Sequence, residues 1–211
     1  MDLSNVYFVT GTAYAGKSTV VKALAEKYNG VACRENYHEE LMEGLDEKEF
    51  PYLAYTKNLK DWHDFIRRSP EEYETWVKGV SLECEKLELQ LLDQISEQGK
   101  PVFVDTNISL ETLRKITDAR HVLIMIADPE VSVNRFFDRP DSEKQFLYQL
   151  MLEEPDPEKA LENFRHCLER VNSADRYYDY LHSGFAVVAR DEERPPERTL
   201  QLAEIAFGLE G

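Results

Sequence analysis

The chain has 211 residues and a formal net charge of -16 at pH 7. Nucleic acids and anionic membranes repel so acidic a protein at long range, so we expect neither as a partner. The length suits one α/β domain with insertions and is short for two complete domains.

The three cysteines include no closely spaced pair, so neither a disulfide framework nor a paired-thiolate zinc site is indicated. The five histidines lack the spacing of metal ligands. No apolar run approaches the length of a membrane span, and the sequence enters its first predicted strand almost at once, which leaves no room for a signal peptide. We therefore expect a soluble protein of the cytoplasm.

The first predicted elements are a strand, a glycine-rich loop and a helix. Residues 6–9 are β-branched and aromatic, as in a buried parallel strand. Residues 11–18 read Gly-Thr-Ala-Tyr-Ala-Gly-Lys-Ser, which is the spacing of a phosphate-binding loop. From residue 18 to 28, apolar side chains recur on one helical face. The loop thus joins a strand to a helix, which is the context that phosphate binding requires.

Each residue type in this loop has a separate role in phosphate binding. Gly11 and Gly16 allow backbone angles that point successive N–H groups at a polyphosphate, and the helix N-terminus adds partial positive charge. Lys17 can reach the β- and γ-phosphates, the Ser18 hydroxyl can bind Mg²⁺, and Thr19 supports the first turn. The alternative is a strand-to-helix turn that binds nothing. The predicted nucleotide-binding residues here are Gly11, Thr12, Ala13, Tyr14, Ala15, Gly16, Lys17, Ser18 and Thr19.

A short second strand is predicted at residues 31–33, and the polar residues Arg34 and Glu35 follow it. Ligands bind at the carboxyl edge of an open parallel sheet, so these two side chains lie near the loop if the first two strands are close neighbours. A solvated turn is the equal alternative.

Residues 37–99 are helical in pattern and rich in aromatic side chains, which indicates an inserted helical lobe. A capping box at Ser69 begins a long helix that Gly99 ends. The aromatic residues are most simply packing residues. Tyr55 and Trp62 are our candidates for stacking on a planar substrate.

The third predicted strand, residues 102–105, ends in a carboxylate. A helix capped by Ser109 follows it. Asp105 at the tip of a strand beside the loop can orient Mg²⁺ together with Ser18, which is the form of a second nucleotide-binding motif.

The run from residue 122 to 127 is continuously apolar and predicts a strand buried on both faces. Asp128 then caps a helix. We expect Arg135 and Arg139, four residues apart, to share one face of that helix, where paired guanidinium groups suit phosphates. The alternative is an ordinary surface helix with ion pairs to neighbouring acids.

The remaining chain predicts further helices over residues 141–182 and a last strand over 184–189. A polar loop at 190–196 precedes a final helix at about 197–209.

Together the loop, Asp105, the arginine helix and the last strand resemble the P-loop small-molecule kinase superfamily, particularly nucleoside and nucleotide kinases. The resemblance implies an α/β fold with a five-stranded parallel sheet in the order 2-3-1-4-5 and helices on both faces. It implies that the lobe at 37–99 binds the phosphoryl acceptor and that 130–182 supplies a lid and additional helices. It also implies that Arg190 and Asp191, after the last strand, hold the adenine ring.

Glu35 resembles the carboxylate that deoxynucleoside kinases keep at the end of strand two, as the base acting on the acceptor hydroxyl. That branch also has an acid followed by Arg at the end of strand three, whereas this chain has Asp105-Thr106-Asn107. The missing Arg leaves open a non-nucleoside acceptor and leaves either Glu35 or Asp105 as the base.

The sequence therefore predicts an ATP- and Mg²⁺-dependent kinase that transfers the γ-phosphoryl group to a small-molecule hydroxyl or phosphate. The alternatives are a nucleotide-binding regulator without transfer and a GTPase or ATPase switch, although the chain has no Asp-x-x-Gly or Asn-Lys-x-Asp segment. The predicted catalytic residues are Lys17, Glu35, Asp105, Arg135 and Arg139, and the predicted metal ligands are Ser18 and Asp105.

Overall fold

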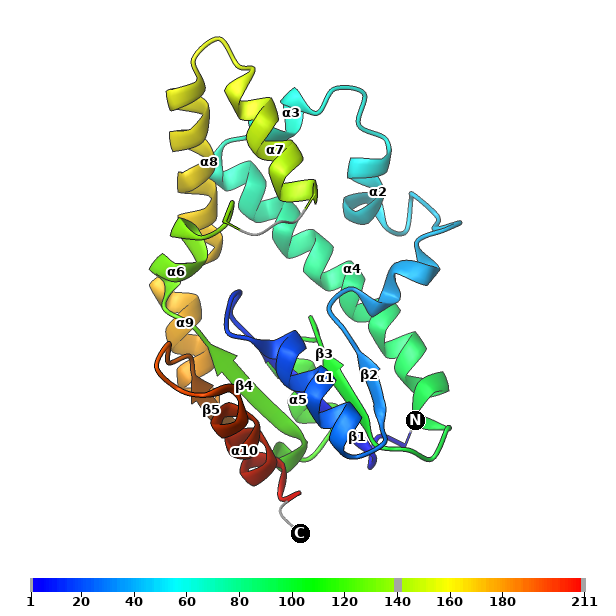
Figure 1. Ribbon diagram of the computed structural model, residues 1–211. Helices are drawn as coiled ribbons and strands as arrows, with labels where there is room; N and C mark the ends of the chain where they lie inside the picture. The colour runs from blue at the N-terminus through cyan, green and yellow to red at the C-terminus, as the bar shows by residue number, and fades with distance from the viewer. Residues whose placement is uncertain (1, 139–141, 210–211) are drawn as a thin grey trace.

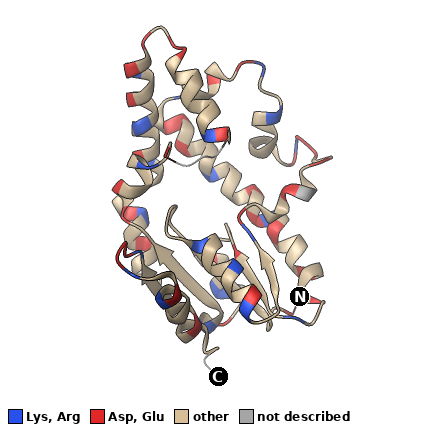
Figure 2. Cartoon of the chain, in the orientation of Figure 1, with Lys and Arg blue, Asp and Glu red and all other residues tan. Residues whose placement is uncertain are grey.

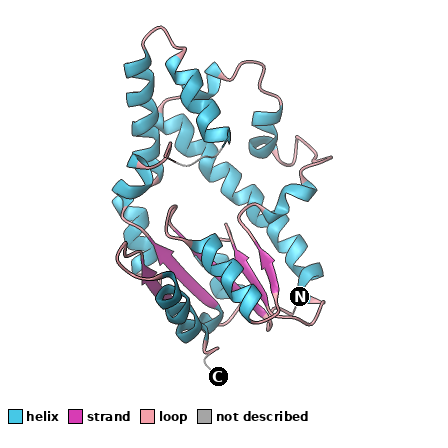
Figure 3. Cartoon of the chain, viewed as in Figure 1, coloured by secondary structure: helices cyan, strands magenta, loops and turns pink. Residues whose placement is uncertain are grey.

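A parallel β-sheet forms one layer of the protein, and a helical lobe stands over the carboxyl edge of that sheet (Figures 1 and 3). The structure is a computed structural model that describes residues 2–138 and 142–209. The strands are β1 (Val6–Gly11), β2 (Val31–Cys33), β3 (Val102–Asp105), β4 (Val122–Ile126) and β5 (Ala186–Ala189). All strand pairs are parallel and their order is β2-β3-β1-β4-β5, so the predicted order is confirmed.

The register of the central strands brings the functional segments to one edge. Val9 pairs with Asp105 on β3, and Gly11 pairs with Met125 on β4. Every residue of β3 and β4 is buried, which explains why both strands are apolar without alternation. The loop after β1 and the carboxylate that ends β3 therefore meet at the carboxyl edge.

Helices cover both faces of the sheet. On one face, α1 (Lys17–Lys27) and α10 (Pro196–Phe207) pack against β1, β3, β4 and β5. On the other face lie the second half of α4 (Pro70–Ser96), α5 (Leu110–Ile116) and α9 (Ala174–Leu181). These helices fix the sheet from both sides and leave its carboxyl edge facing the lobe (Figure 1).

The helical lobe has its own core, separate from those of the sheet. Phe65, Ile66, Met151 and Phe164 are buried there, and Tyr73 joins them from the first half of α4. The lobe elements are η1 (Tyr37–Leu41), α2 (Pro51–Lys57), α3 (His63–Ile66), the first half of α4, α6 (Pro129–Asn134), α7 (Ser142–Leu152) and α8 (Pro157–Val171). The insertion between β2 and β3 thus packs with helices that follow β4.

The long helix α4 begins as predicted. The Ser69 hydroxyl accepts a hydrogen bond from the backbone N–H of Glu72, and the Glu72 carboxylate accepts one from the backbone N–H of Ser69. α4 then runs for 27 residues, from the lobe to the far end of the sheet. A short 3-10 turn, η2 (Ala119–His121), precedes β4.

The predicted arginine helix is wrong. α6 ends at Asn134, and Arg135 is its C-cap residue. The Tyr14 hydroxyl donates to the carbonyls of Arg135 (2.8 Å) and Phe136 (3.1 Å), which occupies acceptors that a longer helix would have used. Arg139 lies outside the described residues.

Acidic and basic side chains are interspersed along the helices of both layers (Figure 2). Within the described part of the chain, no helix combines the length and apolar character needed to span a membrane.

Candidate functional site

The loop between β1 and α1, residues 11–18, has a backbone that requires glycine at two positions. Gly11 has φ +135°, and a Cβ there would lie 1.9 Å from the Met125 carbonyl oxygen. Gly16 has φ +91° at the N-cap of α1. Tyr14 also adopts a left-handed conformation, with φ +63°. The loop therefore curls back over the start of α1, whose first backbone N–H groups have no intrahelical partner.

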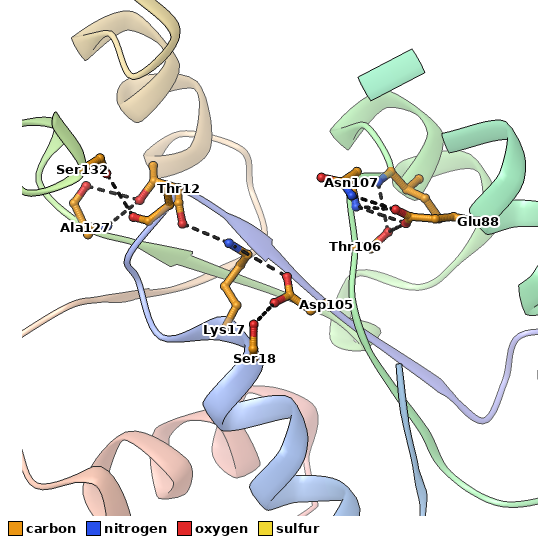
Figure 4. Close-up of polar contacts among 11 residues, drawn as sticks. Thr12, Lys17, Ser18, Glu88, Asp105, Thr106, Asn107, Ala127 and Ser132 are labelled. Carbon is orange, nitrogen blue, oxygen red and sulfur yellow. Dashed lines mark hydrogen bonds and ion pairs between the residues drawn. The ribbon is translucent and has the colours of Figure 1, made fainter. Parts of the chain in front are cut away.

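Hydrogen bonds to β4 and α6 hold this loop in place (Figure 4). The Thr12 hydroxyl accepts from the backbone N–H of Ala127 at 2.6 Å, and the Thr12 N–H donates to the Met125 carbonyl at 3.0 Å. The Ser132 hydroxyl donates to the Ala13 carbonyl at 3.1 Å. These contacts from β4 and α6 fix the course of the loop backbone.

Lys17, Ser18 and Asp105 come together at the centre of the site (Figure 4). The Ser18 hydroxyl donates to Asp105 Oδ2 at 2.6 Å. Lys17 Nζ lies 3.9 Å from Asp105 Oδ1 and donates to the Thr12 carbonyl at 3.1 Å. The sequence predicted this meeting from two motifs 87 residues apart, and the β1–β3 register produces it.

Asp105 is 2% exposed, and its burial raises the pKa of the carboxyl above the ordinary value of 3.8. The neighbouring carboxylates Glu35 and Glu88 raise this pKa further, whereas the Lys17 ammonium and the hydrogen bond from Ser18 lower it. An added cation at this position would offset the cost of the buried charge.

Glu35 is exposed and follows β2, at the same edge of the sheet as Asp105. It borders a cavity of about 850 Å³ that lies between the sheet edge and the lobe. Of the predicted residues 11–19, all but the buried Ala15 border this cavity, as does Asp105. The structure therefore brings Glu35 to the same cavity as the loop.

Tyr55 and Trp62, our candidates for substrate stacking, do not border this cavity. The Arg68 guanidinium lies over the Tyr55 ring at 3.9 Å, and Trp62 packs edge-on against Phe65 and Phe146. Both pack within the helical lobe. The aromatic residues that do border the cavity are Tyr14, Tyr73, Phe136, Tyr177 and Tyr180.

Arg135 and Arg190 meet at a carboxylate that the sequence analysis did not single out. Glu192 Oε1 lies 3.2 Å from Arg135 Nη1 and 2.9 Å from Arg190 Nε. Arg190 also donates to the Tyr14 carbonyl, so the segment after β5 contacts the loop. Asp191 instead pairs with Arg194 at 3.5 Å, and neither Arg135, Arg190 nor Asp191 borders the cavity.

The sequence analysis also missed Glu88, which is fully buried on α4. Its carboxylate accepts hydrogen bonds from the Thr106 hydroxyl (2.6 Å), the Asn107 N–H (3.1 Å) and the Asn107 side-chain amide (2.8 Å). The available signal was its spacing, four residues after Cys84 and four before Leu92 on the buried face. A carboxylate in such a stripe requires buried donors opposite it.

Two oxygen ligands for a metal ion are already adjacent in the site. Mg²⁺ binds oxygen atoms, usually one or two protein groups with waters and substrate phosphates. The Ser18 hydroxyl and the Asp105 carboxylate fit that requirement. The described residues contain no group of three or more His, Cys, Asp and Glu that could hold an ion without such a substrate.

Comparison with known proteins adds no relative: no family model matches the chain, and no curated protein sequence matches it significantly.

Proposed function

We propose that this protein is an ATP- and Mg²⁺-dependent kinase of the P-loop type that transfers the γ-phosphoryl group to a small molecule. The observation that carries the proposal is the meeting of Lys17, Ser18 and Asp105 in the wall of the 850 Å³ cavity. Ligands of open α/β sheets bind at this carboxyl edge, and the loop before α1 presents N–H groups to an anion.

In this proposal the chain positions the phosphates and stabilises their charge. The loop N–H groups and Lys17 bind the polyphosphate, and Arg190 and Asp191 lie next to the adenine ring. Arg135 leaves its ion pair with Glu192 and closes over the transferring group. Such positioning accounts for most of the catalysis in phosphoryl transfer.

Ser18 and Asp105 would hold Mg²⁺, which when bound neutralises charge on the β- and γ-phosphates. Because Asp105 already accepts the Ser18 hydrogen bond, Glu35 is the better placed base for the acceptor proton. Glu35→Gln should then lower turnover by about 10²-fold or more and leave Mg·ATP binding unchanged. The reverse pattern would assign the base to Asp105.

The test is ATP turnover over a library of nucleosides, nucleotides, sugars and metabolite alcohols, with mass spectrometry of the products. Lys17→Ala should abolish transfer and leave the fold intact, because among the described residues the polar contacts of the Lys17 ammonium are one hydrogen bond to the Thr12 carbonyl and a 3.9 Å ion pair with Asp105. Lys22→Ala, on the exposed face of α1, is the matched control and should behave as wild type.

Two outcomes would contradict the proposal. Transfer that persists unchanged in Lys17→Ala would exclude the loop from the site. ATP hydrolysis at one rate with and without every compound would instead indicate a regulatory ATPase without small-molecule transfer.

A further inference from the structure

The side chain of Asn107 has a fixed orientation beside the site. Its Nδ2 donates to Glu88 Oε1 at 2.8 Å, and its backbone N–H donates to Glu88 Oε2 at 3.1 Å. A carboxylate only accepts hydrogen bonds, so the amide nitrogen must face Glu88. The amide oxygen, Oδ1, then faces away from Glu88 (Figure 4).

Because Glu88 is buried, reversing the Asn107 amide would raise the free energy of the folded protein. The Glu88 side chain has no exposure to solvent, and the hydroxyl of Thr106, itself 4% exposed, donates to it at 2.6 Å. Turning the Asn107 amide would place Oδ1 against a buried carboxylate and remove one of its donors. Asn107 is exposed and borders the cavity, so it presents a hydrogen-bond acceptor at a defined place.

The wall of the cavity around Asn107 offers further acceptors. This wall consists of Glu35 after β2 and residues 105–110 after β3. The charged side chains of this wall, Glu35 and Asp105, are both acidic, Asn107 Oδ1 adds an acceptor, and no described residue of the wall is Lys or Arg. Lys17 Nζ lies 3.9 Å from Asp105 Oδ1, but the proposed function assigns this ammonium to the ATP phosphates. A phosphate or carboxylate on the acceptor, placed beside Glu35 and Asn107, would therefore be repelled by the acidic side chains.

We propose, on the basis of the kinase activity proposed above, that the phosphoryl acceptor is an unphosphorylated polyhydroxyl or amino-alcohol compound. Asn107 Oδ1 accepts a hydrogen bond from a hydroxyl or amine next to the reacting hydroxyl. The reacting oxygen forms a bond to the γ-phosphorus, and the bond from that phosphorus to the β–γ bridging oxygen breaks. The electron pair of that bond leaves with ADP, and the hydroxyl proton passes to the Glu35 or Asp105 carboxylate.

The first experiment compares each parent compound with its monophosphate and its deoxy analogue on the wild-type protein. The probes are glucose, ribose, adenosine and ethanolamine, with glucose 6-phosphate, ribose 5-phosphate, AMP and phosphoethanolamine. For the parent that reacts, we expect its monophosphate to give at least 10-fold lower kcat/KM. The analogue that lacks the neighbouring hydroxyl or amine should have a KM at least about 10-fold higher.

The second experiment tests Asn107 as a specificity residue. Asn107→Ala should raise the KM for the acceptor about 10-fold or more and leave the KM for ATP unchanged. Glu88→Gln should produce the same split, because a glutamine can accept from and donate to Asn107 and so releases the amide orientation. Asn58→Ala is the matched control, since Asn58 is exposed and does not border the cavity.

The outcomes separate this inference from the kinase proposal. Turnover of a monophosphate in preference to its parent overturns the acceptor assignment and leaves the kinase proposal standing. The same holds if the wild-type KM for the deoxy analogue equals that for the parent and the KM of Asn107→Ala for the parent is unchanged. The deoxy comparison uses wild-type protein, so it decides the matter even if the variants fold poorly. Absence of both Mg·ATP binding and turnover with any compound overturns the kinase proposal, and this inference falls with it.

Discussion

The buried Asp105 carboxylate destabilises the folded protein when it is ionised, because burial removes it from water. Burial raises its pKa above 3.8, so between 3.8 and the raised pKa the folded state binds more protons than the unfolded state. The free energy of unfolding therefore falls as the pH rises through this window. The loss persists at neutral pH.

Asp105→Asn should remove that cost. In metal- and nucleotide-free protein at pH 7, we expect the variant to melt at a higher temperature than wild type, with the gap narrowing toward pH 3.8. Thermal melts from pH 4 to 8 measure it. Asp118→Asn is the control of opposite sign, because a backbone hydrogen bond from Arg120 lowers the pKa of Asp118 and this variant should lose stability at neutral pH. An Asp105→Asn variant that melts below wild type at pH 7 would contradict the argument.

The sequence identified Lys17, Ser18 and Asp105 because fixed spacing and strand context are local properties. It did not identify Glu88, whose partners Thr106 and Asn107 become its neighbours only when α4 packs beneath β3. Because Leu87 and Leu89 flank Glu88, the sequence around it has the pattern of an apolar helix that packs in a core. Its spacing places Glu88 on the buried face of α4, but the hydrogen-bond partners it meets there depend on tertiary packing and cannot be identified from that spacing.

At the scale of elements, α4 holds the ends of other elements with its carboxylates. Glu83 accepts from the backbone N–H groups of Tyr52 (3.1 Å) and Leu53 (2.7 Å) in the first turn of α2. Glu85 accepts from the Ser109 N–H at 2.8 Å, at the N-cap of α5. A negative charge at a helix N-terminus satisfies unpaired donors and interacts favourably with the helix dipole.

Glu83→Ala should lower the free energy of unfolding by about 2 kcal/mol, because it leaves the buried N–H of Leu53 and the partly buried N–H of Tyr52 without this acceptor. Urea denaturation followed by circular dichroism measures this. Glu97→Ala, on an exposed residue just past α4, should change stability by less than about 0.5 kcal/mol. Equal effects of the two substitutions would mean that the capping contacts contribute nothing.

Arg135 offers a test of the segment after α6. If it closes over the γ-phosphoryl group as proposed, Arg135→Ala lowers kcat on the order of 10³-fold and affects ATP binding less. Arg120→Ala is the matched control, since Arg120 is likewise an exposed arginine paired with a carboxylate, Asp118, at 3.4 Å. Unchanged kcat, with a stability loss under about 1 kcal/mol, would leave Arg135 as a surface partner of Glu192.

The sequence predicted which helices and strands occur more accurately than where each of them ends. The α4 capping box and the caps at Ser109 and Asp128 follow from local patterns, and the structure contains them. The strand order, which the resemblance to P-loop kinases implied, is also observed. The end of α6 does not follow from a local pattern, because the Tyr14 hydroxyl that binds the carbonyls after Asn134 comes from a loop 121 residues earlier. Helix ends fixed by distant side chains are invisible to periodicity.

At the scale of the whole molecule, each cysteine belongs to a different hydrophobic cluster. Cys33 ends β2 and packs on one face of the sheet, Cys84 is on α4 and packs with Phe50 and Leu53, and Cys167 is in the lobe. Burial raises the pKa of the first two thiols to about 12 and that of Cys167 to about 11. Thiolate is the reactive form, so all three are protected while the surrounding packing is intact.

A thiol reagent at pH 7 should therefore label Cys33 and Cys84 at least about 10³-fold more slowly in the folded protein than in the unfolded chain, because their pKa rises from 9.0 to about 12. For Cys167, whose pKa rises to about 11, the expected factor is at least about 10². Mass spectrometry of peptides against urea concentration measures each site. Rapid labelling of Cys167 in native buffer would show that the lobe opens independently of the sheet.

The continuity of α4 limits how this fold can be recombined. Its first half packs in the lobe core through Tyr73, and its second half packs under the sheet through Leu92. The insertion between β2 and β3 therefore cannot be exchanged independently of the sheet. A chimera that replaces this insertion also replaces α4, a 27-residue helix about 40 Å long, and the second half of that helix has to match the recipient's sheet. Substitutions in the lobe end of this helix should therefore change the lobe alone, whereas the sheet end, including the carboxylate at Glu88, has to stay matched to the sheet.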